Sequence, residues 1–571
     1  MKEEIQKFFK GEADDGPETL AKYSHDASLL EVRPELVLYP KDSEDVQNLV
    51  KWVSGNKERY PNLSITARSA GTDMSGGAIG ESIILDFTRH MNKLVGGPLP
   101  IDIFSRKKIS QKIGHYPLMP SYITVEPGMF YRDFEKLTLA KGLILPCYTA
   151  SKSLNAMGGM FGNNSAGERT LKYGKTEDYI LESKVVFSDG IERVIKPIFL
   201  NQIEKQEKIY QQIDNLITEN EEEIEQAKPK VHKNSAGYYI WNVKKENIFD
   251  LNKLLVGSQG TLGIVTEITF RLIPDNKYSK LVAIFMNDLA PLGRLVEEVL
   301  KHSPETLEAY DDKTMKLAVR FFSDFLKSRG FFGMLQLARS FLPEFRMMLT
   351  GGFPKLIILA EFAGENEKEV NDKCVKLVEH IKNFNLELHV TKTQAEANKY
   401  WDIRRESFAL LRKHVRGMRT APFIDDIVVR PEFLPKFLPE LNTILNKYQK
   451  DLTYTLAGHA GDGNFHIIPL MDFSRPDTAK IILELGNQVY DLVAKYHGSI
   501  TAEHNDGIIR TPYLNKMFDE TTLKIFAEIK KIFDPQNIFN PGKKVPTASQ
   551  GGTKEYIASH IAREHKTSHK I

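Results

Sequence analysis

Apolar and polar positions divide the chain into two patterns. In the first half, short apolar runs with β-branched residues alternate with turn-forming residues, which predicts strands joined by loops. The predicted strands are Pro34–Tyr39, Ser64–Ala67, Ser82–Phe87, Tyr122–Val125, Leu181–Phe187, Ile191–Ile195 and Ile264–Leu272. The segments Ser43–Val53, behind a serine cap, and Tyr131–Lys141 have apolar residues at helical spacing, and the charged segment Glu204–Lys228 predicts a solvated helix.

The second half has longer elements. Lys280–Met286, Lys355–Glu361 and Glu387–Val390 predict strands, and amphipathic helices such as Pro291–His302 and Glu367–Phe384 separate them. This alternation indicates a second, α+β domain with an antiparallel sheet. Val319–Leu349 combines phenylalanines with arginines and lysines, a composition that suits a membrane interface, the wall of a substrate pocket or a subunit interface.

Three glycine-rich segments lie at the edges of predicted strands in the first half. They are Arg68–Gly80 (RSAGTDMSGGAIG), Ser151–Gly174 (SKSLNAMGGMFGNNSAGERTLKYG) and Gly257–Gly263 (GSQGTLG). Consecutive backbone N–H groups in the first segment predict an anion-binding nest that suits a pyrophosphate. No Gly-Lys-Ser/Thr follows, as a P-loop requires, and a strand follows in place of the helix of a Rossmann fingerprint. We therefore expect a dinucleotide held by loops between strands, with ordinary surface loops as the alternative.

Composition excludes several classes of protein. With 571 residues the chain should contain about two to four domains. The net charge of +2 gives no field that favours nucleic acid. Cys147 and Cys374 are the only cysteines, so a disulfide framework or a cysteine-ligated iron–sulfur cluster is not expected, and redox chemistry would require a bound cofactor. The charged N-terminus lacks the apolar core of a signal peptide, and no uncharged apolar run reaches the ~20 residues of a membrane span. We expect a cytoplasmic protein, with peripheral contact at the inner face of the membrane as an alternative.

The segment Ala457–His466 (AGHAGDGNFH) predicts a hairpin with two histidines on one face. A two-residue turn at Asp462-Gly463 would place His459 directly opposite His466. Directly opposed side chains share a face with Cβ atoms about 5 Å apart, so both imidazoles would reach one divalent metal. The alternative is a pair of structural histidines beside a turn.

Glu503 and His504 stand in GSITAEHNDG, which predicts the end of a strand before a turn. Adjacent side chains on a strand point to opposite faces, so one residue should bind metal and the other should not. We assign Glu503 to the metal and His504 to proton removal, because neutral imidazole suits a general base near pH 7. Trp401–Ser407 lies in a predicted charged helix, where Arg404 is our candidate for binding a substrate carboxylate, and we expect most of the other arginines to be solvated.

Together, the motifs RSAGTDMSGGA, NAMGGMFGNNSAG, GSQGTLGIVTE, HAGDGNFH, TAEHNDG and DPQNIFNPGK resemble the FAD-dependent D-2-hydroxyacid dehydrogenases, which include D-lactate dehydrogenase, D-2-hydroxyglutarate dehydrogenase and the flavin subunit of glycolate oxidase. The resemblance covers Pro34 to Lys543 and implies an α+β protein of the vanillyl-alcohol-oxidase type, with a two-subdomain FAD-binding domain and an α+β cap. The expected organisation is an N-terminal segment (1–33), the FAD-binding domain (34–275), a substrate-binding cap (276–515), a C-terminal helix and NPGK segment that return to the FAD domain (516–545), and a polar tail (546–571).

The resemblance also implies site residues. FAD would be held without a covalent bond, because Thr72 stands where covalent members of the superfamily carry histidine. The implied FAD-binding residues are Arg68, Ala70, Gly71, Thr72, Asp73, Met74, Ser75, Gly158, Gly159, Asn163, Asn164, Ser165, Gly167, Gly260, Gly263, Ile264, Val265 and Asn540. His459, His466 and Glu503 would bind a divalent metal (Zn or Mn/Fe), His504 would be the base and Arg404 would hold the substrate.

The implied reaction is oxidation of a small D-2-hydroxy acid, D-lactate-like or glycolate-like, to the 2-oxo acid. Electrons would pass to a quinone, an electron-transfer flavoprotein or a cytochrome. Two positions depart from the family: Asn505 replaces the glycine of Glu-His-Gly, and Ile424 stands where members that act on diacids carry lysine. The alternatives are a metal-free flavin alcohol or phenol oxidase, and a non-catalytic flavin subunit that conducts electrons within a complex.

Overall fold

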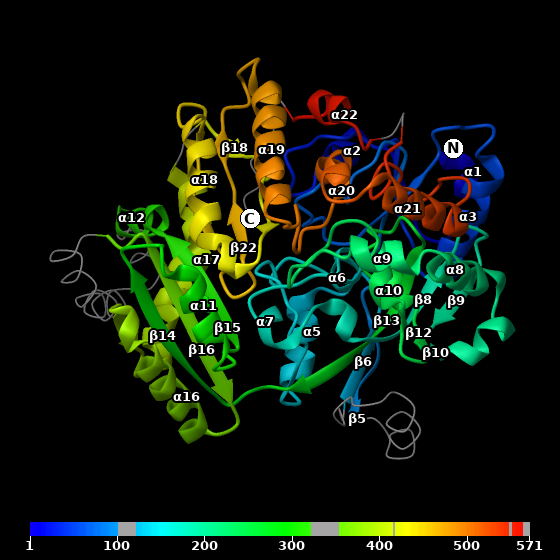
Figure 1. Ribbon diagram of the computed structural model, residues 1–571. Coiled ribbons are helices and arrows are strands. Elements are labelled where there is room, and N and C mark those ends of the chain that lie inside the picture. Colours follow the sequence, from blue (N-terminus) through cyan, green and yellow to red (C-terminus); the bar gives the residue numbers. More distant parts are fainter. Residues whose placement is uncertain (101–120, 321–352, 415–416, 548–550, 563–571) are drawn as a thin grey trace.

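The computed structural model describes residues 1–100, 121–320, 353–414, 417–547 and 551–562. Figure 1 shows two halves side by side. One half contains the N-terminal elements and the helix α21 (Glu520–Phe533). The other contains a large sheet covered by α11 (Leu292–Leu300), α16 (Glu367–His380), α18 (Leu434–Asn446) and α19 (Thr478–Lys495).

A four-stranded sheet lies near the N-terminus, in the order β1-β2-β4-β3. The strands β2 (Leu36–Tyr39), β4 (Ile83–Asp86) and β3 (Ile65–Arg68) are parallel, and β1 (Glu12–Asp14) pairs antiparallel with β2 at the edge. All four residues of β2 and of β4 are buried, as expected for parallel strands covered on both faces. Helix α3 (Ser43–Asn56) connects β2 to β3, and its cap is Asp42, whose carboxylate accepts from the backbone N–H of Asp45, rather than the predicted Ser43.

The second sheet of this half is antiparallel, in the order β5-β6-β13-β8-β9, with β7 on the end of β13. Its strands are β5 (Leu94–Pro100), β6 (Ser121–Val125), β7 (Leu143–Ile144), β8 (Ile180–Val186), β9 (Glu192–Ile195) and β13 (Ile264–Pro274). Helix α5 (Tyr131–Leu139) packs on it through Phe134, whose ring lies 5.9 Å from that of Phe270. The predicted solvated helix is two helices, α8 (Lys208–Glu219) and α9 (Glu221–Ala227); each contacts α21, so one face is buried.

The large sheet of the other half is seven-stranded, in the order β17-β14-β16-β15-β21-β22-β19. Its strands are β14 (Tyr278–Met286), β15 (Thr306–Asp311), β16 (Leu356–Gly364), β17 (Glu387–Val390), β19 (Ile427–Val428), β21 (Leu456–His459) and β22 (Asn464–Ile467). Every neighbouring pair is antiparallel, which confirms the predicted sheet. The aromatic and basic segment 319–349 lies, from residue 321 onward, outside the described residues.

Further α-helices and strands are present in both halves. They are α1 (Lys2–Ile5), α2 (Pro17–Tyr23), α6 (Met157–Asn163), α7 (Thr170–Tyr173), α10 (Asn252–Leu255), α12 (Asp312–Arg320), α17 (Gln394–His414), α20 (Gly507–Arg510), α22 (Lys554–Ser559), β10 (Ile198–Phe199), β11 (Lys244–Lys245), β12 (Ile248–Phe249), β18 (Arg419–Thr420), β20 (Leu452–Thr453) and β23 (Leu470–Met471). No helix in the described ranges is both long and apolar enough to cross a bilayer.

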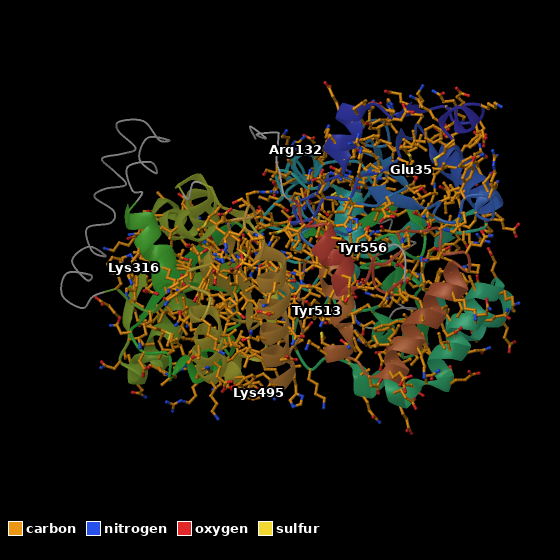
Figure 2. The ribbon with its side chains drawn as sticks, turned by 90° about the horizontal axis from the view of Figure 1, so that it is seen from above. Glu35, Arg132, Lys316, Lys495, Tyr513 and Tyr556 are labelled. Carbon is orange, nitrogen blue, oxygen red and sulfur yellow. The ribbon has the colours of Figure 1, made fainter. Side chains whose placement is uncertain are left out.

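The chain returns to the N-terminal half after α21. The backbone N–H of Ile65 donates to Ile538 O, and that of Asn540 donates to Ile65 O, so this segment extends the parallel sheet beside β3. Residues 551–562 of the predicted polar tail are also packed: Ile557 and Ile561 are buried in the core of the large sheet, and Ile561 pairs with Leu30. Tyr513 and Tyr556 both appear near the middle of the view in Figure 2, and the ammonium group of Lys554, at the start of α22, lies 4.7 Å from the ring of Tyr513.

Replacing Ile557 with alanine should lower the free energy of unfolding by about 2–5 kcal/mol, since truncation of a buried isoleucine leaves a cavity. Ile557 is 2 % exposed. Urea denaturation measures the change, with Val375→Ala on α16 as the control because that side chain is 64 % exposed. Equal stabilities of the two variants would show that α22 does not contribute to the core.

Candidate active site

The three glycine-rich segments meet at the carboxylate of Asp73. Asp73 Oδ1 accepts from the backbone N–H groups of Ser75 and Gly77, at 2.7 and 2.9 Å. The other oxygen, Oδ2, accepts from Asn163 Nδ2 at 3.0 Å and from Gln259 Nε2 at 3.2 Å. One buried side chain therefore holds together loops that lie about 90 and 190 residues apart in sequence.

Between Arg68 and Ser75 the first loop presents donors without protein acceptors. Within the described part of the chain, the backbone N–H groups of residues 70–74 make no hydrogen bond. Gly71 has φ +68°, and a Cβ there would lie 2.3 Å from the Arg68 guanidinium. Consecutive unpaired N–H groups around a left-handed residue form an anion-binding nest. The arrangement fits the phosphates of a dinucleotide.

The middle of the second segment is helical rather than a loop. Gly158 and Gly159 lie within α6, which ends at Asn164 in the left-handed conformation (φ 51°). A Cβ on Gly158 would lie 2.6 Å from Pro127 Cβ, whereas Gly159 faces open space. The sequence pattern predicts a loop here, but close packing against Pro127 favours glycine in this helix despite its low helix propensity.

Other predicted FAD-binding residues also fix the loops to one another. Asn540 Nδ2 donates to Gly77 O and to Gln259 O, and its Oδ1 accepts from Thr66 Oγ1. The Arg68 guanidinium lies 5.0 Å from the ring of Tyr23 and donates to backbone carbonyls. The remaining predicted residues lie in the same loops or at the start of β13, as follows: Ala70, Thr72 and Met74 in the first loop, Ser165 and Gly167 after α6, Gly260 and Gly263 in the third loop, and Ile264 and Val265 in β13.

In the histidine hairpin the predicted register is wrong by two residues. His459 pairs with Asn464, and His466 pairs with Ala457, because the loop has four residues, Ala460 to Gly463. A shift of two residues keeps every side chain on its face, so the histidines are diagonal neighbours with ring centroids 5.3 Å apart. This loop requires glycine at position 463, because φ there is +72° and a Cβ would lie 1.8 Å from Val429 O.

Each of three histidines points Nδ1 at a buried carboxylate. His459 Nδ1 lies 2.5 Å from Glu308 Oε1. His466 Nδ1 lies 3.1 Å from Asp425 Oδ1, and His504 Nδ1 lies 2.7 Å from Asp425 Oδ2. Such pairing fixes ring orientation and leaves Nε2 as the ligand atom, the usual arrangement around histidine-bound metals.

Glu503 lies at the centre of this cluster. Its Oε1 is 3.1 Å from His459 Nε2, and its Oε2 is 4.0 Å from His466 Nε2. One potential ligand atom from each of these three residues lies within 4.8 Å of the others. Two imidazoles and one carboxylate form a donor set that suits Zn²⁺, Fe²⁺ or Mn²⁺.

The predicted strand at Glu503 and His504 is wrong, because the segment wraps around the carboxylate of Asp426. Asp426 Oδ2 accepts from Thr501 Oγ1 and from three backbone N–H groups, those of Ala502, Glu503 and His504. This compact turn brings both side chains, Glu503 and His504, to one cluster with Asp426, rather than to the opposite faces of a strand.

Lys233 and Asp462 complete the cluster and were missed by sequence reasoning. Lys233 is fully buried, with Nζ 2.6 Å from Glu503 Oε1 and 2.9 Å from Asp462 Oδ2. Burial alone would raise the pKa of Glu503, but His459 and Lys233 hold it well below its usual range. The loop Lys233–Gly237 was visible as a small polar loop, but nothing in its sequence indicated a partner about 270 residues away.

Arg404 reaches the cluster through Glu308. Its Nη2 lies 3.1 Å from Glu308 Oε2, while Glu308 Oε1 faces His459. Arg405 points elsewhere, to Glu168 at 2.6 Å. The structure therefore places Arg404, but not Arg405, next to the histidines; Glu308 was missed because it lies on a strand far from the motifs.

Asn505 joins the cluster to the glycine-rich loops. Its Nδ2 donates to Gly257 O at 2.8 Å and to Asn163 O at 3.3 Å. The residue is fully buried at φ +68°, a conformation that glycine and asparagine tolerate better than other residues. Asn505 therefore adopts a conformation that glycine also tolerates, and it makes two hydrogen bonds between the halves.

Two family models match the chain. The model described as FAD linked oxidases, C-terminal domain, matches residues 275–544, and the FAD binding domain matches residues 34–97 and 110–195. Among solved structures, 4-ethylphenol oxidase from Gulosibacter chungangensis has a TM-score of 0.64 at 14% identity, covering 93% of this chain and 94% of that one. An alkyldihydroxyacetonephosphate synthase has a TM-score of 0.63 at 15% identity, covering 95% and 84%. The predicted fold, with a vanillyl-alcohol-oxidase-type FAD-binding domain, is confirmed.

Three curated relatives are each about a quarter identical to this chain in sequence. D-2-hydroxyglutarate dehydrogenase of Pseudomonas putida is 25% identical over 94% of this chain and 50% of its own length. Glycolate oxidase subunit GlcD of Bacillus subtilis is 26% identical over 91% of both chains, and D-lactate dehydrogenase of Anaerostipes hadrus is 24% identical over 92% and 93%. The chain spans about half the length of the first curated relatives that it matches.

The cluster predicts a pH dependence of stability in the metal-free protein. Burial lowers the pKa of His504, but Asp426 and Asp425 outweigh it and raise the pKa to about 9. A folded pKa above the unfolded value of about 6.5 stabilises the protein below pH 6.5, and this contribution disappears as pH rises through 9. When the pH is raised from 6.5 to 9.5, the free energy of unfolding measured by urea denaturation should therefore fall less for His504→Gln than for the wild type. An equal loss in both proteins would contradict the ionic partnership with Asp425 and Asp426.

Proposed function

We propose that this chain, which models of the FAD-linked oxidase C-terminal domain and of the FAD binding domain match over residues 275–544, 34–97 and 110–195, oxidises a small D-2-hydroxy acid to the corresponding 2-oxo acid. One observation carries the proposal: the turn that bears Glu503 and His504 is hydrogen-bonded to the glycine-rich loops. Asn505 donates to the second and third loops, and Gly507 N donates to Gln259 Oε1 at 2.9 Å. A proton-accepting histidine is thereby held next to the loops that would bind a flavin.

The residues fit FAD. The unpaired N–H groups of residues 70–74 would hold its phosphates. Asn163 and Asn540 lie at the junction of the glycine-rich loops, where Asn163 donates to Asp73 and Asn540 donates to Gly77 O. Thr72 has no ring nitrogen to form a covalent flavin link, which supports non-covalent binding. FAD, when bound, supplies a two-electron acceptor for the hydrogen on the substrate's Cα.

A divalent metal fits His459, His466 and Glu503. All three side chains are held by partners: Glu308 and Asp425 for the imidazoles, and Lys233 for the carboxylate. The metal, when bound, acts as a Lewis acid that polarises the substrate hydroxyl, and its charge lowers the pKa of neighbouring imidazoles. Zinc, manganese and iron all suit this donor set.

His504 is the proposed base. Its Nδ1 faces Asp425, so Nε2 is the atom that takes the hydroxyl proton. With a pKa near 9 in the metal-free protein, the ring would be protonated at neutral pH, and the base would require a cation nearby to be neutral. Asp425 then stabilises the imidazolium that forms after proton transfer.

The proposed substrate is D-lactate-like or glycolate-like, with Arg404 binding its carboxylate. Relatives named for lactate and glycolate support this class. Ile424 is fully buried in the apolar core of the cap, so this position offers no cation for the second carboxylate of a diacid. A quinone, an electron-transfer flavoprotein or a cytochrome is the proposed electron acceptor; cytoplasmic location, with peripheral membrane contact through 319–349, is part of the same proposal.

One observation favours a metal-free flavin oxidase as a second candidate. The ammonium group of Lys233 already balances the charge of Glu503 at 2.6 Å. The cluster would then be stable without a metal ion. Asn505, in contrast, gives no support to a non-catalytic subunit, because it keeps the left-handed backbone that precedes α20.

Substrate-dependent bleaching distinguishes these candidates. Under anaerobic conditions, D-lactate or glycolate should reduce the flavin of the purified protein, and D-2-hydroxyglutarate should act more slowly. Treatment with a chelator should abolish bleaching, and added Zn²⁺ or Mn²⁺ should restore it, because the polarising cation has been removed and replaced. Flavin absorbance is the measurement; bleaching that survives metal removal, verified by elemental analysis, identifies the metal-free oxidase.

Replacing His504 with glutamine tests the base. FAD should remain bound, while the rate of flavin reduction should fall by about 10²–10⁴, the usual contribution of a general base. Stopped-flow absorbance gives the rate, and His90→Gln is the control, because His90 pairs with the partly exposed Glu12 at 2.8 Å in the N-terminal half, outside the histidine cluster. An unchanged rate in the His504 variant would exclude this residue as the base.

A further inference from the structure

A second cluster of metal-ligand side chains lies on the helices of the cap, away from the proposed active site. Glu298 is in α11, His302 follows the end of this helix, and His380 is the last residue of α16. His302 Nε2 and His380 Nδ1 are 3.1 Å apart, with ring centroids at 4.8 Å. Glu298 Oε1 lies 3.6 Å from His380 Nδ1 and 4.0 Å from His302 Nε2.

These three distances match the size of a transition-metal ion. A point in the plane of the three ligand atoms lies about 2.1 Å from each of them, the length of Zn–N and Zn–O bonds in proteins. The three distances leave room for an ion at this point, and solvent would complete its coordination. The set of two imidazoles and one carboxylate is that of many zinc sites.

The surroundings favour a cation at this point. His380 ends α16 and His302 lies just beyond the end of α11, and the C-terminal end of a helix dipole carries partial negative charge. Ser303, with φ +52°, follows His302, and its backbone N–H donates to Leu300 O, the last residue of α11, at 2.9 Å. Lys301 binds the other carboxylate oxygen, Glu298 Oε2, at 2.7 Å, which holds the side chain and leaves Oε1 directed at the histidines.

We propose that Glu298, His302 and His380 bind one divalent transition-metal ion of the zinc type. The ion links the C-terminal ends of α11 and α16, two helices that both pack on the core of the large sheet. The site shares no residue with the cluster around Glu503, so it is independent of the proposed oxidation chemistry.

Counting zinc tests the proposal. The full-length, FAD-loaded protein is stripped of metal with a chelator, equilibrated with Zn²⁺, dialysed and analysed for zinc and protein. His380→Ala should hold one equivalent less than the wild type. His380 has 57% of its side chain exposed, so the fold should survive the change, and circular dichroism verifies this. His90→Ala, which removes a histidine that pairs with a single carboxylate among the residues the structure describes, should hold as much zinc as the wild type.

Glu298→Gln provides a second variant that keeps both imidazoles and the size of the side chain. It should lower zinc affinity at this site in a calorimetric titration, and His380→Ala should remove the same binding phase. The proposal is wrong if wild type and His380→Ala retain equal equivalents of zinc, or if Glu298→Gln leaves every binding phase unchanged. Bleaching of the flavin by substrate is expected to be the same in all three proteins.

Discussion

Four hydrogen bonds to a single carboxylate oxygen shape the candidate active site. Asp426 Oδ2 collects the hydroxyl of Thr501 and three consecutive backbone N–H groups, and both the aspartate and the turn around it are buried. Three adjacent N–H groups can converge on one acceptor only if the backbone curls around it. This curl turns Glu503 and His504, which an extended strand would separate, toward one cluster. The position of the candidate base and of the candidate metal ligand therefore depends on a third residue, Asp426, which lies 77 residues before Glu503 in the sequence.

The same turn joins the halves of the molecule. Asn505 and Gly507, at its end, contact the second and third glycine-rich loops, and Gln259 continues the connection to Asp73 in the first loop. Because the donors and acceptors are buried, breaking any one of them would leave an unpaired polar group, which is more costly than the bond is worth. The interface between the halves is therefore specific in geometry, as hydride transfer between a bound substrate and a flavin would require.

Charge in the cluster is balanced by alternation. Starting from Arg404, the sequence of contacts is Glu308, His459, Glu503, Lys233 and Asp462, so each charged group has an opposite neighbour. Burial of a lone charge is prohibitive, whereas a paired and hydrogen-bonded network is tolerated. The balance also explains why the pKa of His459 rises to about 9 although burial lowers it: Glu308 and Glu503 outweigh the burial. A divalent cation would add positive charge to a network that is already close to neutrality. Its charge would repel the ammonium group of Lys233, which contacts the same carboxylate, Glu503.

The amino-acid sequence determined the strands, most helices and the face on which the histidines lie. Periodicity of two survives an error of two residues in register, so His459 and His466 share a face with either turn. Sequence could not determine what tertiary contacts decide. The turn at Glu503 forms because Asp426, 77 residues earlier, replaces the partner strand, and α22 packs because Ile557 and Ile561 meet a core formed by distant segments. Lys233, Glu308 and Asp425 became visible as partners only in three dimensions, because a buried charge is specified by the group that faces it and not by its neighbours along the chain.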